Sequence, residues 1–279
     1  MQKRVAAIHD ISCFGKCSLT VALPIISAAG IECAAIPTAV LSTHTGGFSG
    51  YTFRDLTDDI LPIANHWKKE DINIDAVYTG YLGSIEQIDI VSKAVYTFAN
   101  ESTILIVDPV MADHGKLYGG FSDDFPKEMC RLCEKADIIT PNITEAAFLT
   151  GIPYIHEPHS KEYIENLIAG LRKITNAKIV LTGVCFNESE MGVAFFDGDK
   201  TEYIFTKRIN ASYHGTGDVF ASVLTSGIVL GKTLKSAVHT AAKFTAECIK
   251  TTNENYPDVH YSVNFEVEIP KLLKLLKII

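Results

Sequence analysis

The chain has 279 residues, of which 47% are hydrophobic, and it carries a formal net charge of −8. The hydrophobic fraction is enough to form a large core, and an acidic balance without a basic stripe argues against nucleic-acid binding. No stretch approaches the roughly 20 apolar residues of a membrane span, and the apolar run at residues 5–8 is too short for a signal peptide. We therefore expect a soluble, cytoplasmic protein that binds neither nucleic acid nor membrane.

Seven cysteines in a chain without an export signal favour reduced thiols over disulfides. Cys130 and Cys133 form a C-x-x-C motif. The sequence offers neither a second pair nor histidines at the spacing of a zinc site. The motif also falls late in a helical pattern, whereas redox motifs lie at the start of a helix, so a structural role is favoured.

Short apolar segments alternate with longer amphipathic segments along the chain. The predicted strands comprise residues 5–9, 33–40, 76–79, 104–107, 137–140 and 179–181, and their nearly continuous apolar sequence is typical of strands buried on both faces. The predicted helices between them comprise residues 18–29, 55–69, 85–99, 123–135, 145–149 and 161–174. This alternation predicts a mostly parallel sheet with helices on both faces, the α/β class.

The last third of the chain has a different pattern. Residues 192–196 and 202–205 flank the turn residues 197–200 and predict an antiparallel hairpin. Two helices are expected to follow, at residues 216–230 and 234–252, the second with one apolar face. No low-complexity linker, internal repeat or charge block divides the sequence, so we expect a single domain over residues 1–279.

Polar, acidic and glycine residues follow nearly every predicted strand. In an open α/β sheet, ligands bind outside the carboxyl ends of the strands, so these residues are expected to meet in one crevice. In chain order they are Asp10, residues 42–47, residues 80–84, residues 108–113, residues 141–145, Thr182 with Gly183, and residues 214–218.

The strongest motif is Gly215-Thr216-Gly217-Asp218, which is followed by an apolar helix. Glycines let the backbone approach a ligand closely, and the free N–H groups and dipole of a helix start favour an anion. Such a place suits a migrating phosphoryl group, and a carboxylate there can accept the proton of an attacking hydroxyl. The motif predicts an anion hole with Asp218 as general base. In the alternative, Thr216 or Asp218 simply caps the helix.

Three acidic residues, Asp108, Asp113 and Glu145, follow different predicted strands. Magnesium in phosphoryl-transfer sites is usually held by one or two carboxylates together with phosphate oxygens and water. These carboxylates are therefore candidates for a magnesium site. In the alternative, Asn142 or Thr144 caps a helix in which Glu145 is a first-turn acid favoured by the dipole.

Residues 112–121 contain Gly115, Gly119 and Gly120, with Lys116 and Tyr118 between them. A glycine-rich segment of this kind can act as a lid that excludes water during phosphoryl transfer. An ordinary surface loop would have the same composition, so both interpretations stay open.

Two common nucleotide motifs are not matched. Residues 14–17 resemble the end of a P-loop, but Asp10 replaces its first glycine and Cys17 replaces its Ser or Thr. No G-x-G-x-x-G follows the first strand, which weakens a nicotinamide-cofactor reading. His9, His44 and His214 lack metal-ligand spacing, and for His9 and His214 a hydrogen-bonded structural role is favoured.

On these motifs the chain resembles the ribokinase-like superfamily and, within it, the pyridoxal kinase family, from residue 5 to about residue 251. Residues 215–220 match the C-terminal signature of the superfamily. Residues 42–45, 80–84 and 108–113 together match the pyridoxal kinase pattern. The resemblance implies a ribokinase-like α/β/α sandwich with a mostly parallel central sheet and a hairpin in its C-terminal half.

The resemblance also implies an activity, which is ATP-dependent phosphorylation of the 5′-hydroxymethyl group of pyridoxal, pyridoxine or pyridoxamine. Asp218 would activate this hydroxyl, and the anion hole would comprise Gly215, Thr216 and Gly217. Around magnesium and the ATP phosphates would lie Asp108, Asp113 and Glu145, with Asn142 and Thr182 along the nucleotide. The pyridine ring would be held by Thr45 and Tyr81, with Asp10 and His44 close by, and Tyr118 would belong to the lid. Kinases of this family are homodimers that use magnesium and often a monovalent cation such as K+.

The chain departs from the family pattern at Asp10, where many members carry a serine that contacts the ring. A carboxylate would prefer a protonated or hydroxyl-bearing ring edge, so the preferred vitamer stays open. Thr43 replaces a frequent asparagine, and Ala112 replaces a frequent glycine. The alternatives are a hydroxymethylpyrimidine or sugar kinase of the same fold, or a non-catalytic vitamin-binding protein. Tyr81 and residues 42–45 argue against the first, and the presence of Asp218 with the other carboxylates argues against the second.

Overall fold

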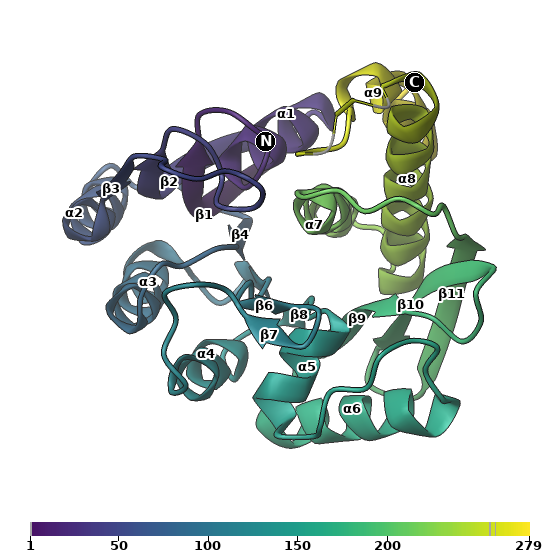
Figure 1. The fold of residues 1–279 in the computed structure, drawn as a ribbon. Coiled ribbons are helices and arrows are strands. Elements are labelled where there is room, and N and C mark those ends of the chain that lie inside the picture. Colours follow the sequence, from purple (N-terminus) through teal and green to yellow (C-terminus); the bar gives the residue numbers. More distant parts are fainter. Residues whose placement is uncertain (1, 257, 260) are drawn as a thin grey trace.

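The computed structural model describes residues 2–256, 258–259 and 261–279, and its centre is a nine-stranded sheet in the order β11-β10-β9-β8-β5-β4-β1-β2-β3 (Figure 1). The strands are β1 Arg4–Ser12, β2 Glu32–Leu41, β3 Phe53–Asp55, β4 Ala76–Thr79, β5 Ile104–Val107, β8 Ile138–Ile139, β9 Lys178–Val184, β10 Glu190–Phe196 and β11 Thr201–Lys207. A separate two-stranded sheet contains β6 Ala112–Asp113 and β7 Lys116–Leu117.

The strands from β9 through β8, β5, β4 and β1 to β2 pair in parallel. Neighbouring residues of a strand face opposite sides, as the pleat of a sheet requires. Ile8 and Val77 enter the core on one face, whereas Ala7 and Tyr78 enter the core on the other, and all four are fully buried. Burial on both faces explains why these strands are apolar throughout.

Both edges of the sheet are antiparallel. β9, β10 and β11 form the predicted hairpin arrangement at one edge. At the other edge, β3 pairs with β2 and was not predicted. The helix expected from Asp55 begins instead at Thr57, because Asp55 is the last residue of β3 and its carboxylate accepts a hydrogen bond from the Thr57 N–H at 2.7 Å.

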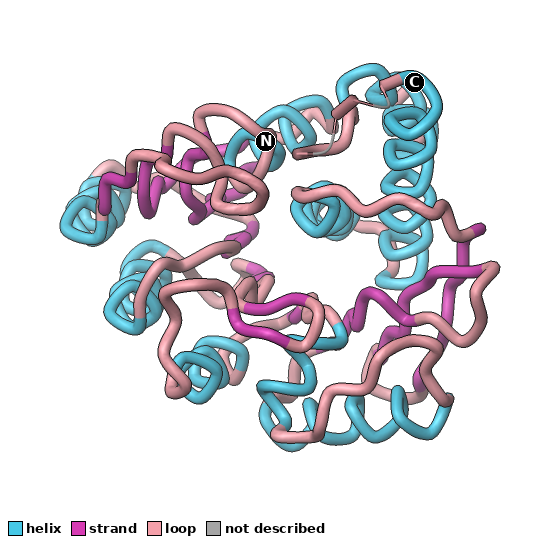
Figure 2. The backbone as a smooth tube through the Cα atoms, viewed as in Figure 1, coloured by secondary structure: helices cyan, strands magenta, loops and turns pink. Residues whose placement is uncertain are grey.

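Helices cover the two faces of the sheet, as Figure 2 shows. The core of one face includes residues from α2 Thr57–Lys69, α3 Ile85–Phe98, α4 Phe125–Cys133, α5 Ile143–Thr150 and α6 Lys161–Ile174. The core of the other face includes residues from α1 Leu19–Ala28, α7 Thr216–Val229, α8 Leu234–Asn255 and α9 Ile269–Leu276. This arrangement confirms the predicted α/β/α sandwich, while α9 and the single turn of 3₁₀ helix before it, Glu266–Glu268, were not predicted.

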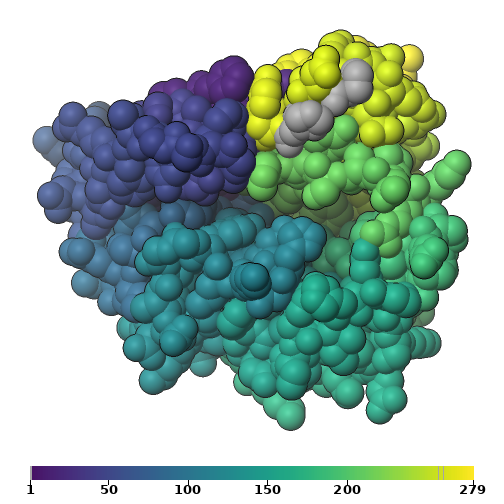
Figure 3. Space-filling view, viewed as in Figure 1, coloured from purple at the N-terminus to yellow at the C-terminus, as the bar shows by residue number. Residues whose placement is uncertain are grey.

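The first part of the chain borders its C-terminal segment, as the purple-blue and yellow atoms in Figure 3 show for this face of the molecule. The Lys16 ammonium donates to Asn264 at 3.2 Å and pairs with Glu266 at 3.0 Å. A ring nitrogen of His44 is 2.8 Å from the backbone oxygen of Tyr261. The C-terminal segment therefore fixes the loops that follow β1 and β2.

All seven cysteines are free thiols, as expected. Cys130 and Cys133 lie in the last turn of α4, and Cys133 is fully buried in the core. Within the described ranges, none of the helices has both the length and the apolar character needed to cross a membrane.

Candidate active site

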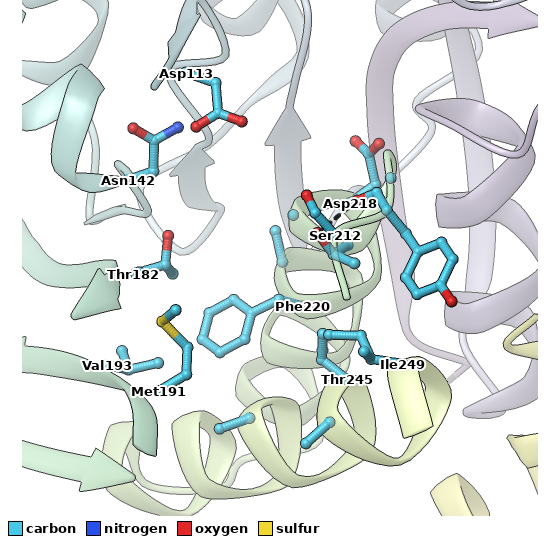
Figure 4. A pocket seen from close by; sticks show the side chains of 18 of the residues that line it. Asp113, Asn142, Thr182, Met191, Val193, Ser212, Asp218, Phe220, Thr245 and Ile249 are labelled. Carbon is cyan, nitrogen blue, oxygen red and sulfur yellow. Dashed lines mark hydrogen bonds between the residues drawn. The ribbon is translucent and has the colours of Figure 1, made fainter. Parts of the chain in front are cut away.

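A cavity of about 460 Å³ opens at the carboxyl edge of the sheet, beside the start of α7. Most of the residues singled out from the sequence line it together: Asp108, Asp113, Tyr118, Asn142, Glu145, Thr182, Gly215, Thr216, Gly217 and Asp218. Figure 4 shows Asp113, Asn142 and Thr182 on one side of this space and Asp218 on the other. The remaining four, Asp10, His44, Thr45 and Tyr81, are not part of this lining.

The backbone at Gly215 begins α7 in a conformation that only glycine adopts easily. Its φ is 77°, and a Cβ atom there would lie 2.5 Å from the carbonyl oxygen of Lys16. The start of the helix carries no side-chain cap, since the Thr216 hydroxyl donates instead to the carbonyl of Tyr213 at 3.2 Å. The capping alternative is therefore wrong, and the first-turn N–H groups remain available to an anion.

Asp218 lies in the first turn of α7 and is half-buried at the wall of the cavity. Burial raises the pKa of its carboxyl to about 7, with a smaller contribution from the negative charge of Asp10, while the nearby Ser18 N–H acts in the opposite direction. A carboxyl with this pKa can accept and release a proton near neutral pH, as a general base requires.

Asp10, near the end of β1, is a second buried carboxyl and is only 4% exposed. The Ser12 hydroxyl donates to its carboxylate at 3.1 Å, yet burial still raises its pKa. The charge of Asp10 contributes to the raised pKa of Asp218. It also contributes to the raised pKa of the Tyr81 phenol, which burial, the larger cause, brings to about 12. Asp10 therefore lies near both Asp218 and Tyr81, and neither Asp10 nor Tyr81 is part of the cavity lining.

Asp108 and Glu145 are buried carboxylates on the opposite side of the base. Burial raises the pKa of both well above the usual range, and the charge of Asp218 adds to this for Asp108, as the charge of Asp108 does for Glu145. The two oxygens of Glu145 accept the N–H groups of Met111 at 3.1 Å and Asn142 at 2.8 Å. Asn142 and Glu145 thus form a capping box at the start of α5, which confirms the capping alternative for these residues without removing Glu145 from the cavity.

The donor atoms fit a magnesium ion that is shared with phosphate. Among the described residues, no group of three or more His, Cys, Asp or Glu side chains is arranged to hold a metal by itself. Magnesium in phosphoryl-transfer sites needs only one or two carboxylates, because phosphate and water supply the other oxygens. Asp108 and Glu145 supply two buried carboxylates without an ion pair to any described residue, and Asp113 lies exposed nearby. The buried Thr140 hydroxyl in the same lining also lacks a hydrogen-bond partner there.

Residues 112–121 form an ordered segment at the mouth of the cavity. Its first half is the hairpin of β6 and β7, with Gly115 at the tip in a left-handed conformation, φ 76°. Tyr118 follows the hairpin, and the pKa of its phenol is raised by burial first and then by the charges of Glu145, Asp113, Asp218 and Asp108. Tyr118 lines the cavity together with these four carboxylates.

The end of the cavity away from the carboxylates is mostly apolar, and its residues were not assigned to a binding site from the sequence. It is lined by Met191 and Val193 of β10, Phe220 of α7, and Thr245 and Ile249 of α8 (Figure 4). We call these five residues the apolar end. Their spacing in the sequence reads as ordinary core packing, so only the tertiary structure shows that they face an open space.

The histidines differ from their expected roles. Both ring nitrogens of His44 are used, one against the Tyr261 carbonyl and one to accept the Gly46 N–H at 3.1 Å, so His44 holds a loop together. His9 is fully buried with neither nitrogen hydrogen-bonded to a described residue, so the expected hydrogen bonds are absent there. His214 lies exposed in the cavity lining, 5.1 Å from His44 between ring centroids, and Thr45 is exposed.

Comparisons with known proteins agree with this geometry. The family model described as phosphomethylpyrimidine kinase matches residues 22–264. This chain belongs to that kinase family. The match to a family of phosphotransferases agrees with the uncapped start of α7 beside a set of carboxylates.

Two solved structures share the fold over nearly the whole chain. One is a candidate phosphomethylpyrimidine kinase of Bacteroides thetaiotaomicron, crystallised with pyridoxal, with 36% identity, a TM-score of 0.90, and coverage of 98% of this chain and 96% of that chain. The other is pyridoxal kinase of Lactobacillus plantarum, with 30% identity, a TM-score of 0.90, and coverage of 99% and 98%. The resemblance to pyridoxal kinases and the ribokinase-like fold is thereby confirmed.

A curated relative points to a different acceptor. The hydroxymethylpyrimidine/phosphomethylpyrimidine kinase of Bacillus subtilis is 31% identical over 222 residues, which are 77% of this chain and 77% of that protein. The chain spans 44% of a probable bifunctional thiamine biosynthetic enzyme of rice. Relatives of both substrate classes therefore match, and the chain is a kinase of the combined pyridoxal kinase and hydroxymethylpyrimidine kinase family.

Proposed function

We propose that this chain transfers the γ-phosphate of Mg-ATP to the 5′-hydroxymethyl group of vitamin B6 vitamers, with Asp218 as the general base. The observation that carries the proposal is the position of Asp218 beside an uncapped helix start, with a pKa near 7. A base of this kind and free N–H groups in the same turn are the two parts that alcohol phosphorylation needs.

The reaction is an in-line displacement. The acceptor oxygen forms a bond to the γ-phosphorus as the bond from that phosphorus to the bridging oxygen of ADP breaks, and the hydroxyl proton passes to Asp218. The N–H groups of Gly215, Thr216 and Gly217 stabilise the charge on the transferred group. Asp108 and Glu145 would hold magnesium together with phosphate oxygens, and the ion would neutralise phosphate charge when bound. Catalysis in this arrangement comes mainly from positioning and charge stabilisation.

We assign the nucleotide an orientation in which its base lies at the apolar end and its γ-phosphate lies beside Asp218. The apolar end suits an adenine base, since the flat ring of Phe220 and the apolar thioether side chain of Met191 form part of its walls. Asn142 and Thr182 line the side of the cavity opposite Asp218, and we assign the ribose and phosphates to the space beside them. The γ-phosphate would then reach the N–H groups beside Asp218.

The acceptor is proposed to lie beyond Asp218, against Asp10, Tyr81, Thr45 and Tyr118. Two observations favour a B6 vitamer. The Bacteroides relative was crystallised with pyridoxal, and the Lactobacillus relative is a pyridoxal kinase. Tyr81 also supplies a half-buried aromatic surface near Asp10, which suits a flat pyridine ring.

The second candidate acceptor is hydroxymethylpyrimidine. It is favoured by the family match and by the Bacillus subtilis relative. Both acceptors present a hydroxymethyl group on a flat nitrogen heterocycle, so the same base and anion hole would serve either one. The single-domain organisation, the cytoplasmic location, the homodimer and the use of a monovalent cation such as K+ stay predictions.

The test is ATP consumption by the purified chain with magnesium and each acceptor separately: pyridoxal, pyridoxine, pyridoxamine and hydroxymethylpyrimidine. Turnover with the pyridine vitamers at a kcat/KM at least tenfold above that with the pyrimidine is the expected result. Turnover with the pyrimidine alone would replace the acceptor and keep the mechanism. Tight binding of a vitamer without ATP consumption would instead identify a vitamin-binding protein.

A further inference from the structure

The segment between β5 and α4 contacts both sides of the proposed active site. Its first limb is bonded to the start of α5. The Met111 N–H donates to Glu145, the Asn142 amide donates to the Ala112 carbonyl at 2.8 Å, and the Gly115 N–H donates to the Thr144 hydroxyl at 3.1 Å. All three partners lie in or beside the capping box of α5, on the side assigned to nucleotide and magnesium.

The second limb ends in an aromatic stack. The ring of Phe121 lies 3.9 Å from the ring of Phe125 between centroids, nearly parallel at 20°. The Phe121 ring also lies 5.6 Å from the ring of Tyr81, at 34°. Phe125 is buried in the core at the start of α4, whereas Tyr81 lies on the side assigned to the acceptor. Phe121 therefore contacts both a buried anchor and the proposed acceptor platform.

The link between the two limbs is a short turn. Tyr118, which lines the cavity, is separated from Phe121 only by Gly119 and Gly120. Gly120 has a φ of 95°, and the Phe121 N–H donates to the Tyr118 carbonyl at 3.4 Å across the two glycines. Because this hydrogen bond ties the two residues together, a movement of Tyr118 toward bound phosphate would move Phe121 as well.

From these contacts we propose that Phe121 is a positioning residue that fixes the orientation of Tyr81 and makes acceptor binding depend on bound nucleotide. Nucleotide and magnesium at Glu145 hold the first limb, the limb fixes Tyr118, and Tyr118 restricts Phe121 against Tyr81. By reciprocity, a bound acceptor strengthens nucleotide binding by the same factor. The inference rests on the proposed function, because it takes Tyr81 as the acceptor platform.

The experiment measures the Kd of pyridoxine by calorimetry, with and without a non-hydrolysable ATP analogue and magnesium. For the unaltered chain, the analogue is expected to tighten pyridoxine binding by about fivefold or more. In Phe121→Leu, which removes the ring, this factor is expected to fall to below twofold, and the KM for pyridoxine is expected to rise more than kcat falls. Phe121→Tyr keeps a ring for stacking and is expected to restore most of the factor.

The control is Phe186→Leu. Phe186 is also half-buried between aromatic rings, 5.5 Å from Tyr203 and 5.3 Å from Phe205, and it lies outside the cavity. In this variant the ATP analogue is expected to tighten pyridoxine binding as much as in the unaltered chain. This result would separate the role of Phe121 from a general loss of aromatic packing. An unaltered chain that phosphorylates pyridoxine without any such factor, or a Phe121→Leu variant that keeps it, overturns the inference alone. A chain that phosphorylates none of the four acceptors overturns the proposed function and the inference with it.

Discussion

The two ends of the cavity are built from different residues on different backbone. The apolar end belongs to the strand β10 and the helices α7 and α8, so rigid elements shape it. The opposite end, which we call the carboxylate end, comprises Asp108, Glu145 and Asp218, with Asp10 just outside the lining. Each of these carboxyls lies near or just after the end of a strand or at the start of a helix. Loops and helix starts place backbone N–H groups and charges where a ligand can reach them.

The difference in composition leads to a difference in energy. The apolar end lowers the free energy of the folded chain where its side chains are buried, as Val193 and Phe220 are, because that apolar surface is removed from water. The carboxylate end acts in the opposite direction, because burial raises the pKa of all four carboxyl groups and so disfavours their ionised forms. Binding at the first end and chemistry at the second should therefore be separable by mutation.

The largest effect is expected from Asp218→Asn, which keeps the size of the side chain and removes the proton acceptor. We expect kcat to fall by about 10²- to 10⁴-fold, since this is the usual contribution of a general base. The KM values for ATP and acceptor should change by less than about threefold, because the ground-state contacts remain. Steady-state kinetics with saturating Mg-ATP measure the change.

Asp123→Asn is the matched control, since Asp123 is exposed and lies outside the cavity lining. It should retain the activity of the unaltered chain. Turnover by Asp218→Asn within about fivefold of the unaltered chain would remove the general-base role.

The second effect concerns stability and pH in buffer free of metal and nucleotide. A carboxyl with a raised pKa keeps its proton in the folded chain after the unfolded chain has lost it, so stability falls as pH rises from about 4 to about 7. Removing the titrating group in Asp218→Asn should make the folded chain more stable above pH 7, by on the order of 4 kcal/mol, because each unit of raised pKa corresponds to about 1.4 kcal/mol. Urea unfolding at several pH values measures the free energy of unfolding.

The two proteins should converge below about pH 3, where the carboxyl is protonated in both states. The other raised carboxyls, Asp10, Asp108 and Glu145, are present in both proteins, so the difference isolates Asp218. A constant difference at all pH values would show that the substitution acts through packing and that the pKa of Asp218 is ordinary.

The smallest effect is expected at the apolar end. Ile249→Ala removes apolar contact that the proposal assigns to the adenine base, with an expected loss of about 1 kcal/mol, or a fivefold rise in the KM for ATP. The KM for the acceptor and the kcat should stay within about twofold of the unaltered chain, because the carboxylate end is untouched. Initial rates at varied ATP measure this separation.

Ile63→Ala, at a half-buried isoleucine on α2, controls for general loss of packing. It should leave the KM for ATP unchanged. An Ile249→Ala variant in which the acceptor KM rises instead would place the acceptor, rather than the nucleotide, at the apolar end.

Part of the site could be predicted because its residues serve the local backbone and the chemistry at once. Gly215 is one example, because its left-handed φ and its close approach to the Lys16 carbonyl disfavour any residue with a side chain at this position. The carboxylates after β5 and at the start of α5 follow from the rule that ligands bind at the carboxyl ends of parallel strands. Asn142 and Glu145 show the limit of such reasoning, because one pattern encodes a capping box and a cavity wall together.

The amino-acid sequence by itself determined the α/β/α class, the course of the parallel strands, and the glycines and acids of the site, because hydrophobic period and turn chemistry are local properties. Only the tertiary structure decided which residues meet. Phe121 against Tyr81, Tyr261 against His44, and the five residues of the apolar end are pairings between distant segments. Such contacts depend on how helices pack across the sheet, and no local pattern encodes whether an apolar side chain faces a neighbour or an open cavity.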